Sequence, residues 1–130
     1  MKWSISWKAS KNPSKQRKYK VNAPLHLKQK LLGTHLSKEL REKYKTRSVE
    51  LRKGDKVKIM KGNHKGKTGK ISRIRIVTQK VYIEGIDTVR KDGNKVLIPL
   101  KASNLMITEL ELGDKKRKSK IENMHSKEKK

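Results

Sequence analysis

The chain of 130 residues contains no cysteine and only 12 acidic side chains. Without cysteine there can be no disulfide framework, no cysteine-ligated zinc and no thiol nucleophile. The four histidines, at positions 26, 35, 64 and 125, have no spacing suited to a metal site. No apolar run approaches the ~18 residues of a membrane span, and the lysine-rich N-terminus lacks the apolar region of a signal peptide. We therefore expect an intracellular protein with no metal, no cofactor and no membrane insertion.

Basic side chains, in contrast, are abundant. The chain has 37 Lys and Arg, which gives a formal net charge of +25. Because self-repulsion of this size opposes a compact state, the charge indicates a polyanionic partner, with nucleic acid first and an anionic membrane second. No segment forms a strongly amphipathic basic helix, which disfavours the membrane. Hydrophobic residues make up 32% of the chain, enough for one modest core.

The charge and the apolar residues divide the chain into four segments. Residues 1–20 hold seven basic residues and no acid, and residues 113–130 hold eight and three. Both ends are poor in apolar residues, so we expect extended basic arms there. Residues 21–50 are predicted to form short helices, and residues 51–112 a folded domain.

Two short helices are expected within residues 21–50. Pro24 suits the first position of one helix, which Gly33 ends. Ser37 is a plausible N-cap of the second, along which apolar residues recur every four positions. Neither segment is long enough to be stable alone in water, so both need the central domain or a partner.

Beyond position 50 the pattern alternates, as at Val57 and Ile59, which indicates β-strands. Asp92-Gly93-Asn94 is a strong hairpin signal. Ile71 falls off the period of Ile74, which suggests a bulge in a long second strand. Five short strands in about sixty residues predict a mainly β fold, a small closed or nearly closed barrel.

The most informative stretch runs from Gly54 to Ile71. Glycines at 62, 66 and 69 sit in a loop with lysines at 61, 65 and 67 and a histidine at 64. Backbone N–H groups beside ammonium groups are a natural phosphate cradle. The alternative is a tight hairpin with a solvated basic face. Residues 52–75 hold ten basic residues and one acid, Asp55, which we interpret as a turn residue that caps backbone N–H groups.

The string Gly-Asp-x-Val-x-Ile-x-x-Gly-x-x-Lys-Gly-x-x-Gly-x-Ile over residues 54–71 resembles a KOW motif. That motif occurs in several ribosomal proteins and in some transcription elongation factors. Further stretches resemble, in the same order, the KOW-containing large-subunit ribosomal protein family in its archaeal and eukaryotic form (numbered twenty-four in bacteria and twenty-six in eukaryotes). They are residues 15–18, 22–26, 36–44, 47–49, 81–86, 103–105 and 114–117.

This resemblance implies an SH3-like barrel and binding to the 5′ domain of large-subunit ribosomal RNA. It further implies an early role in subunit assembly, a place near the polypeptide exit tunnel, and a cytoplasmic location on the ribosome. The expected partners are ribosomal RNA and neighbouring ribosomal proteins, with no small-molecule substrate and no homo-oligomer. No catalytic residue is expected, since Glu84 and Asp87 have no companion that would form an acid–base pair.

Candidate RNA contacts come from the basic segments and from the glycine-rich loop. Trp3 and Trp7 could stack on unpaired bases, fold back onto the barrel or contact a neighbouring protein. Tyr82 could contact a base or pack beneath an arm. The candidates are Lys15, Arg17, Lys18, Tyr19, Lys20, His26, Arg41, Arg47, Lys61, Gly62, Asn63, His64, Lys65, Gly66, Lys67, Arg73, Arg75, Lys115, Lys116 and Arg117.

The basic charge and the KOW motif also fit two other functions. One is a KOW module of a transcription elongation factor, which would need a further domain that binds the polymerase. The other is a small basic chromatin-type protein that binds DNA in the minor groove. Comparable affinity for duplex DNA and for ribosomal RNA fragments would favour the second.

Overall fold

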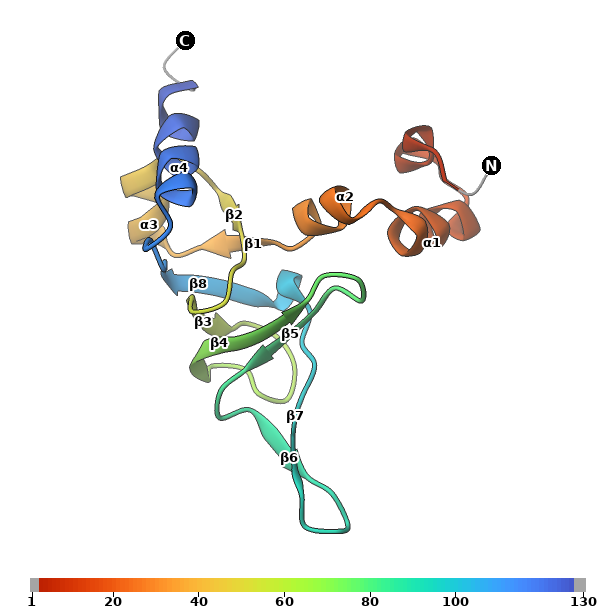
Figure 1. The fold of residues 1–130 in the computed structure, drawn as a ribbon, viewed down its shortest axis with the longest axis vertical. Helices are drawn as coiled ribbons and strands as arrows, with labels where there is room; N and C mark the ends of the chain where they lie inside the picture. Colours follow the sequence, from red (N-terminus) through yellow and green to blue (C-terminus); the bar gives the residue numbers. More distant parts are fainter. Residues whose placement is uncertain (1–2, 128–130) are drawn as a thin grey trace.

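The computed structural model describes residues 3–127 and is mainly β, as expected (Figure 1). Six strands form one sheet in the order β2-β1-β8-β3-β4-β5, and two more form a separate hairpin, β6-β7. The strands are β1 Gly33–Leu36, β2 Ser48–Glu50, β3 Lys56–Ile59, β4 Thr68–Arg75, β5 Lys80–Ile83, β6 Asp87–Val89, β7 Lys95–Leu97 and β8 Leu105–Glu109.

The sheet curls but is not closed by a continuous ladder. Its neighbours pair antiparallel, except that β1 runs parallel to β8. The chain returns to β5 through a single bridge between Val81 and Leu100. No closed barrel therefore forms within residues 3–127, and the strand predicted around Val96 belongs to the separate β6-β7 hairpin. Two short strands, β1 and β2, add to the sheet an edge that the sequence pattern did not indicate.

The core lies between the curled strands. Val57 and Ile59 on β3 are buried, while the lysines between them are exposed, as the alternating pattern predicts. Ile71, Val81 and Ile107 complete the same apolar cluster. This alternation fixes the register, because a shift by one residue would move every lysine of β3 inward.

Two local predictions are confirmed. The pairing of β4 with β5 shifts between Ile71 and Arg73, which is the expected bulge. Gly93 has φ of 84° at the tip of the β6-β7 hairpin, a conformation that glycine adopts readily. This hairpin extends away from the sheet, at the bottom of Figure 1.

The N-terminal segment is helical where an extended arm was expected. It contains a 3-10 turn, η1 (Ile5–Ala9), and the helix α1 (Pro13–Asn22), whose N-cap Asn12 accepts from the backbone N–H of Ser14 at 3.0 Å. The lysines and arginine of this segment have good helix propensity, so a capped helix can form despite the charge. Figure 1 shows η1 and α1 to one side of the sheet.

Two short helices occur within residues 21–50, as predicted: α2 (Leu25–Lys30) and α3 (Lys38–Tyr44). Pro24 is the N-cap of α2 instead of its first residue, and Gly33 begins β1. The side chain of Ser37 accepts from the backbone N–H of Leu40, which makes it the N-cap of α3. A further short turn, η2 (Ala102–Asn104), precedes β8.

The C-terminal segment is also helical instead of extended. Helix α4 (Lys115–Lys127) packs near α3, on the opposite side of the sheet from α1 (Figure 1). Ile121 on α4 is 2% exposed and belongs to the core cluster. In the described part of the chain, no helix has the length and apolar character needed to cross a membrane.

Candidate nucleic-acid interface

The β3–β4 loop (residues 60–67) is held in a defined shape by its own backbone. The N–H of Gly66 donates to the carbonyl of Ile59 at 2.8 Å, and the N–H of Ile59 donates to the carbonyl of Lys67 at 2.9 Å. Gly62 and Gly66 have φ of 101° and 89°, so glycine meets a backbone requirement at both positions. The loop therefore projects as a rigid turn.

Three exposed lysines on this turn, Lys61, Lys65 and Lys67, are called the loop lysines below. The ammonium of Lys67 lies 3.5 Å from Nδ1 of the half-buried His64. The N–H groups of residues 65–67 bond to carbonyls within the turn or at the end of β3. Ammonium groups are thus the main donors that this turn offers to a phosphate, and these three amides are already used.

The third glycine of the motif serves the fold. A Cβ atom on Gly69 would lie 2.5 Å from Cγ2 of Ile83 and 2.9 Å from the carbonyl oxygen of Glu84. Glycine is therefore needed at this position because β4 and the end of β5 approach each other closely. The backbone that passes close to Gly69 belongs to the protein itself, so this glycine is explained by the fold.

On β4, Arg73 and Arg75 are exposed and point away from the core. Arg75 is paired in register with Lys80 of β5, and Arg73 with the half-buried Tyr82. These cations form a short basic row on the outer face of the β4-β5 pair.

Helix α1 presents a second basic surface. Lys15, Arg17, Lys18 and Lys20 are exposed along it, and His26 is exposed on α2. In the whole chain the first acidic residue occurs at position 39, so no carboxylate of either helix offsets this charge. The surface suits a polyanion.

Tyr19 does not join that surface. It is 8% exposed, and its ring stacks on Trp3 with centroids 5.5 Å apart. The indole N–H of Trp3 donates to the carbonyl of Tyr19 at 3.1 Å. The half-buried Trp7 accepts at its carbonyl from Gln16 at 3.1 Å. Trp3 thus packs on Tyr19 of α1, and Gln16 of α1 holds η1 through the Trp7 carbonyl. We therefore leave Tyr19 out of the interface.

Arg41 and Arg47 differ in availability. Nε of Arg41 donates to the carbonyl of Leu36 at 2.9 Å, and the side chain is half-buried. Arg47 is exposed beside β2. Arg41 is therefore partly committed to holding α3 on β1, while Arg47 is open to a partner.

The structure assigns Arg117 an internal role. The side chain is 4% exposed, and its guanidinium donates to both carboxylate oxygens of Asp55, at 2.6 and 2.7 Å. It also donates to the carbonyls of Glu111 at 2.8 Å and Glu50 at 3.1 Å. Asp55 also accepts from the backbone N–H of Arg52, which confirms its predicted turn role. Since its donors face the interior, Arg117 is removed from the candidate contacts.

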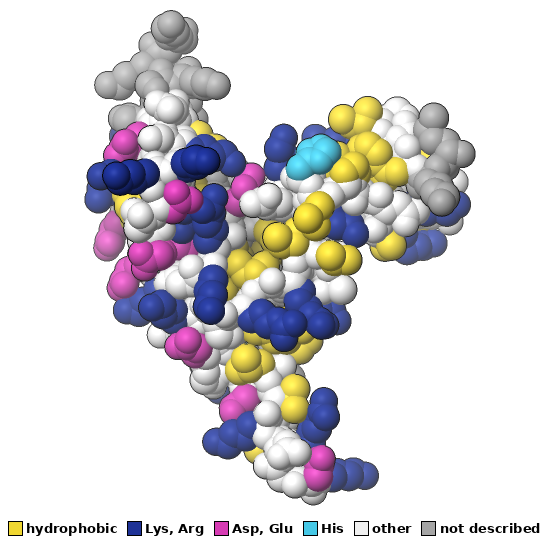
Figure 2. Space-filling view, in the orientation of Figure 1, with side chains coloured by type: hydrophobic (Ala, Val, Ile, Leu, Met, Phe, Trp, Pro, Cys, Tyr) yellow, Lys and Arg dark blue, Asp and Glu magenta, His cyan; other side chains and the backbone are white. Residues whose placement is uncertain are grey.

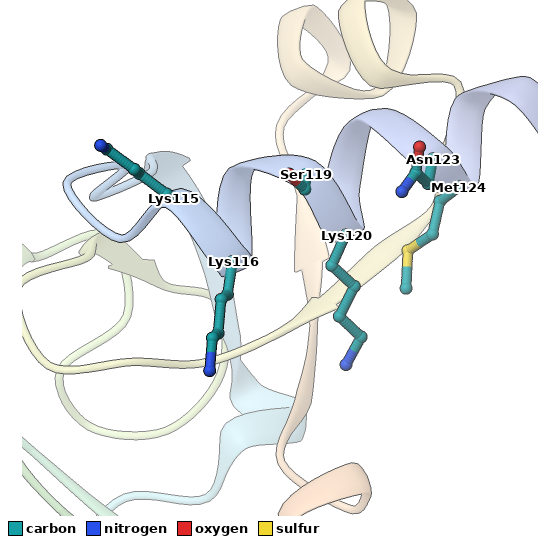
Figure 3. A pocket seen from close by; sticks show the side chains of 6 residues that line it. All are labelled: Lys115, Lys116, Ser119, Lys120, Asn123 and Met124. Atoms are coloured by element: carbon teal, nitrogen blue, oxygen red, sulfur yellow. The ribbon is translucent and has the colours of Figure 1, made fainter.

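Lys115 and Lys116, which precede Arg117 on α4, are exposed to solvent. Figure 3 shows Lys116, Lys120 and Met124 along one side of α4, with Lys115 pointing elsewhere. Together with Ser119 and Asn123 they line an open hollow on the helix. Lys120 lies 3.4 Å from a carboxylate oxygen of Glu50, so its charge is partly offset.

The start of α4 is fixed by Asp114. Its carboxylate accepts from the backbone N–H of Lys116 at 2.9 Å and pairs with Arg52. The N–H of Lys116, followed by the Arg52 guanidinium, lowers the pKa of Asp114 below its ordinary value. The ionised carboxylate is the form that caps the helix.

A cleft joins the N-terminal helices to the sheet. It has a volume of about 480 Å³ and is lined by the end of α1, the end of α2, the β4–β5 turn and the segment before β8. Lys20, Lys80 and Lys101 stand around it. Sequence reasoning missed Lys80 and Lys101, because their segments are brought together by a bridge between Val81 and Leu100 that no local pattern indicates.

The basic side chains therefore form several separate surfaces instead of one patch. Helices α1 and α4 lie on opposite sides of the sheet (Figure 1), and the loop lysines belong to neither helix. On the face drawn in Figure 2, most acidic side chains gather on the side of α4, and Lys and Arg are more widely spread. No cluster of three metal-ligating side chains occurs in the part of the chain that the structure describes. A large, folded polyanion that meets the protein from several sides fits this arrangement.

Known proteins resemble this chain over most of its length. A family model described as ribosomal proteins L26 eukaryotic, L24P archaeal matches residues 10–124. A relative from Methanosarcina barkeri (strain Fusaro / DSM 804), named large ribosomal subunit protein uL24, is 44% identical over 112 residues. The aligned region is 86% of this chain and 97% of the relative. The chain belongs to this ribosomal protein family.

The family that the KOW motif and the ordered stretches indicated is thus confirmed. The matched span contains α1, the β3–β4 loop and α4 as far as Met124, so each basic surface lies within the family's shared region. Trp3 and Trp7 precede the span. The contacts of both residues with α1, a ring stack for Trp3 and a backbone hydrogen bond for Trp7, therefore involve residues outside the matched span.

Proposed function

We propose that this protein is a structural component of the large ribosomal subunit that binds ribosomal RNA. The observation that carries the proposal is the family match over residues 10–124, on a chain whose net charge is +25. Its archaeal relative is named as a large-subunit protein. The role requires charge and shape, and no catalytic group.

The mechanism of binding follows from the surface of folded RNA. Phosphates of neighbouring RNA helices crowd together, and exposed Lys and Arg neutralise them. The A-form major groove admits few side chains, so recognition uses backbone, shape and 2′-hydroxyls. The loop lysines, the α1 cations and Lys116 on α4 can each reach a different part of the RNA, since they lie on three different elements and α1 and α4 are on opposite sides of the sheet.

The resemblance supports a finer assignment. The proposed partner is the 5′ domain of the large-subunit RNA, which the protein binds early in assembly, near the polypeptide exit tunnel. Neighbouring ribosomal proteins are the other expected partners, and the chain acts as a single copy. Sedimentation of a lysate tests the class: the protein should migrate in equal amount with the large subunit after a moderate-salt wash. A free pool associated with RNA polymerase would contradict the proposal and favour the elongation module.

The loop lysines give a test at the level of residues. Replacing all three with Ala should flatten the dependence of log affinity on log salt by about 2 to 3, since each phosphate contact contributes roughly 0.7 to 0.9. The readout is binding of a large-subunit RNA fragment between low and moderate salt. A matched variant removes three other exposed lysines, which are Lys38, Lys43 and Lys53.

The control variant has the same net charge as the loop variant but leaves the β3–β4 loop intact. Its salt dependence should stay near that of the wild type. Equal flattening in both variants would mean that only net charge matters, and an unchanged slope in the loop variant would remove the loop from the interface.

A further inference from the structure

The cleft between the N-terminal helices and the sheet, called the junction cleft below, is a separate feature from the exposed basic surfaces. Four chain segments meet there, and the volume of about 480 Å³ lies within the usual ~300–1,000 Å³ of small-ligand sites. Its lining therefore decides what it can hold.

The wall of the junction cleft is largely apolar. Leu31 at the end of α2, Pro99, Leu100 and Ala102 all contribute to it. Leu31 remains 40% exposed, so part of this apolar surface faces solvent. Such a wall suits the flat face of a nucleobase, because apolar surface of the base and of the wall leaves water when the two meet.

The rim of the junction cleft is cationic. Lys20, Lys80 and Lys101 come from three different segments, and all three are exposed. None of the residues that line the cleft is acidic. Ammonium groups around an apolar wall match a ligand with an apolar centre and phosphates at its edge.

Gln79 supplies a polar group at the same place. It lines the cleft in the β4–β5 turn, with φ of 55°. Its Nε2 is buried and has no hydrogen-bond partner within residues 3–127. A buried amide donor without a partner is unfavourable, and this amide can turn toward a ligand without breaking a bond. The edge of a base carries the acceptors that it lacks.

We propose that the junction cleft binds one unpaired nucleotide of RNA. The base lies against Leu31 and Pro99, the amide of Gln79 bonds to the edge of the base, and the lysines on the rim contact the flanking phosphates. This inference rests on the proposed function, because it names a site for the same RNA partner. Single-stranded loops and bulges are where proteins read RNA bases, so an unpaired nucleotide is the natural occupant.

The test is a titration of the full-length ¹⁵N-labelled protein, followed by NMR. The probes are AMP, CMP, GMP and UMP, with ribose 5-phosphate and inorganic phosphate as controls. At least one nucleotide should shift the side-chain amide of Gln79 and the backbone amides of Leu31 and Lys101 in a saturable way. The two controls should leave the Gln79 amide unmoved. Identical shifts with nucleotide and ribose 5-phosphate, or no shift at Gln79, would overturn the proposal.

Two carboxylate variants separate the cleft from general charge. Leu31→Asp places an acid on the cleft wall, whereas Val77→Asp places one on the nearby turn, at a residue that is 66% exposed and does not line the cleft. Leu31→Asp should weaken the tightest nucleotide about tenfold, because it replaces an apolar contact with a carboxylate that must be desolvated against the base. Val77→Asp should change it less than about twofold, since exposed charges interact weakly. Equal weakening by both would refute a built site.

A third variant tests the amide. Gln79→Asn keeps a residue that tolerates positive φ but withdraws the amide from the cleft, so the fold should persist while nucleotide binding weakens. Unaltered binding would remove Gln79 from the site. If the nucleotide effects are absent but the loop lysines still set the salt dependence of RNA binding, the cleft fails and the proposed function stands. If the nucleotide effects and the effect of the loop lysines are both absent, the cleft proposal and the proposed function are both refuted.

Discussion

The buried pair of Arg117 and Asp55 makes the strongest prediction about stability. Replacing Arg117 with Met removes two charge-assisted bonds to Asp55 and leaves the carbonyls of Glu50 and Glu111 without these donors. The Asp55 carboxylate, 0% exposed, would keep its bonds to two backbone N–H groups but lose its counter-charge. Breaking a buried ion pair in this way typically costs about 3–5 kcal/mol.

That loss is a large share of the total, because a domain of this size has roughly 5–15 kcal/mol of stability. The assay is urea unfolding at neutral pH, followed by far-UV circular dichroism, with the m-value compared between variants. Lys116→Met is the matched control, since it removes one adjacent basic residue whose side chain is exposed. It should change the free energy of unfolding by less than about 0.5 kcal/mol.

A double-mutant cycle identifies the cause. Asp55→Asn combined with Arg117→Met removes both charges, so the double variant should be more stable than the sum of the single losses implies. Additive losses would mean that the two side chains do not act as a pair. An Arg117→Met protein within about 1 kcal/mol of the wild type would refute the structural role of Arg117. RNA binding should be more sensitive to the exposed residue: Lys116→Met should reduce the dependence of log affinity on log salt by roughly 0.7 to 0.9.

Two further predictions concern the fold. Gly69→Ala should lower the free energy of unfolding by about 1–3 kcal/mol, because the added Cβ overpacks against Ile83 and the Glu84 carbonyl. Gly33→Ala, where the nearest contact of a Cβ would be at 3.5 Å, should lower it less. Denaturant unfolding compares the two variants, and equal losses of stability would contradict the packing argument. The pKa of Asp114 is lower in the folded state than its ordinary 3.8, so its stabilisation of α4 is present above that value and fades as pH falls through the folded pKa. Acid titration of α4 by amide hydrogen exchange, with Asp114→Asn as the reference, should show this component in the wild type alone.

Much of the central domain could be predicted because its signals are local. The alternation at Val57 and Ile59, the hairpin at Gly93 and the bulge at Ile71 all follow from side-chain period and backbone freedom. Strand β1 could not be predicted in this way. His35 and Leu36 of β1 pair in parallel with β8, about 70 positions later, and residues 33–35 pair antiparallel with β2. The pairing with β8 is a contact that no local pattern encodes.

The two ends of the chain show a different limit. Charge density and scarce apolar residues favour extended arms, yet α1 and α4 are helical because small local groups offset the repulsion. At the N-terminus Asn12 caps the helix, and Trp3 stacks on Tyr19. At the C-terminus Asp114 caps α4. Composition averages over a segment and so cannot reveal a cap or a single aromatic pair, although both are visible as residues.

The basic run at residues 115–118 shows why charge alone does not define an interface. On a helix, residue 117 shares a face with residue 121, which is an isoleucine in the core. That face points inward, while Lys116 lies on the outer side (Figure 3). The inward position holds the run's only arginine, and its guanidinium donates to four oxygens at once, more than the three protons of a lysine ammonium allow. The choice of Arg over Lys within a uniform run is therefore the signal in the sequence that separates the cation that holds α4 from those available to RNA.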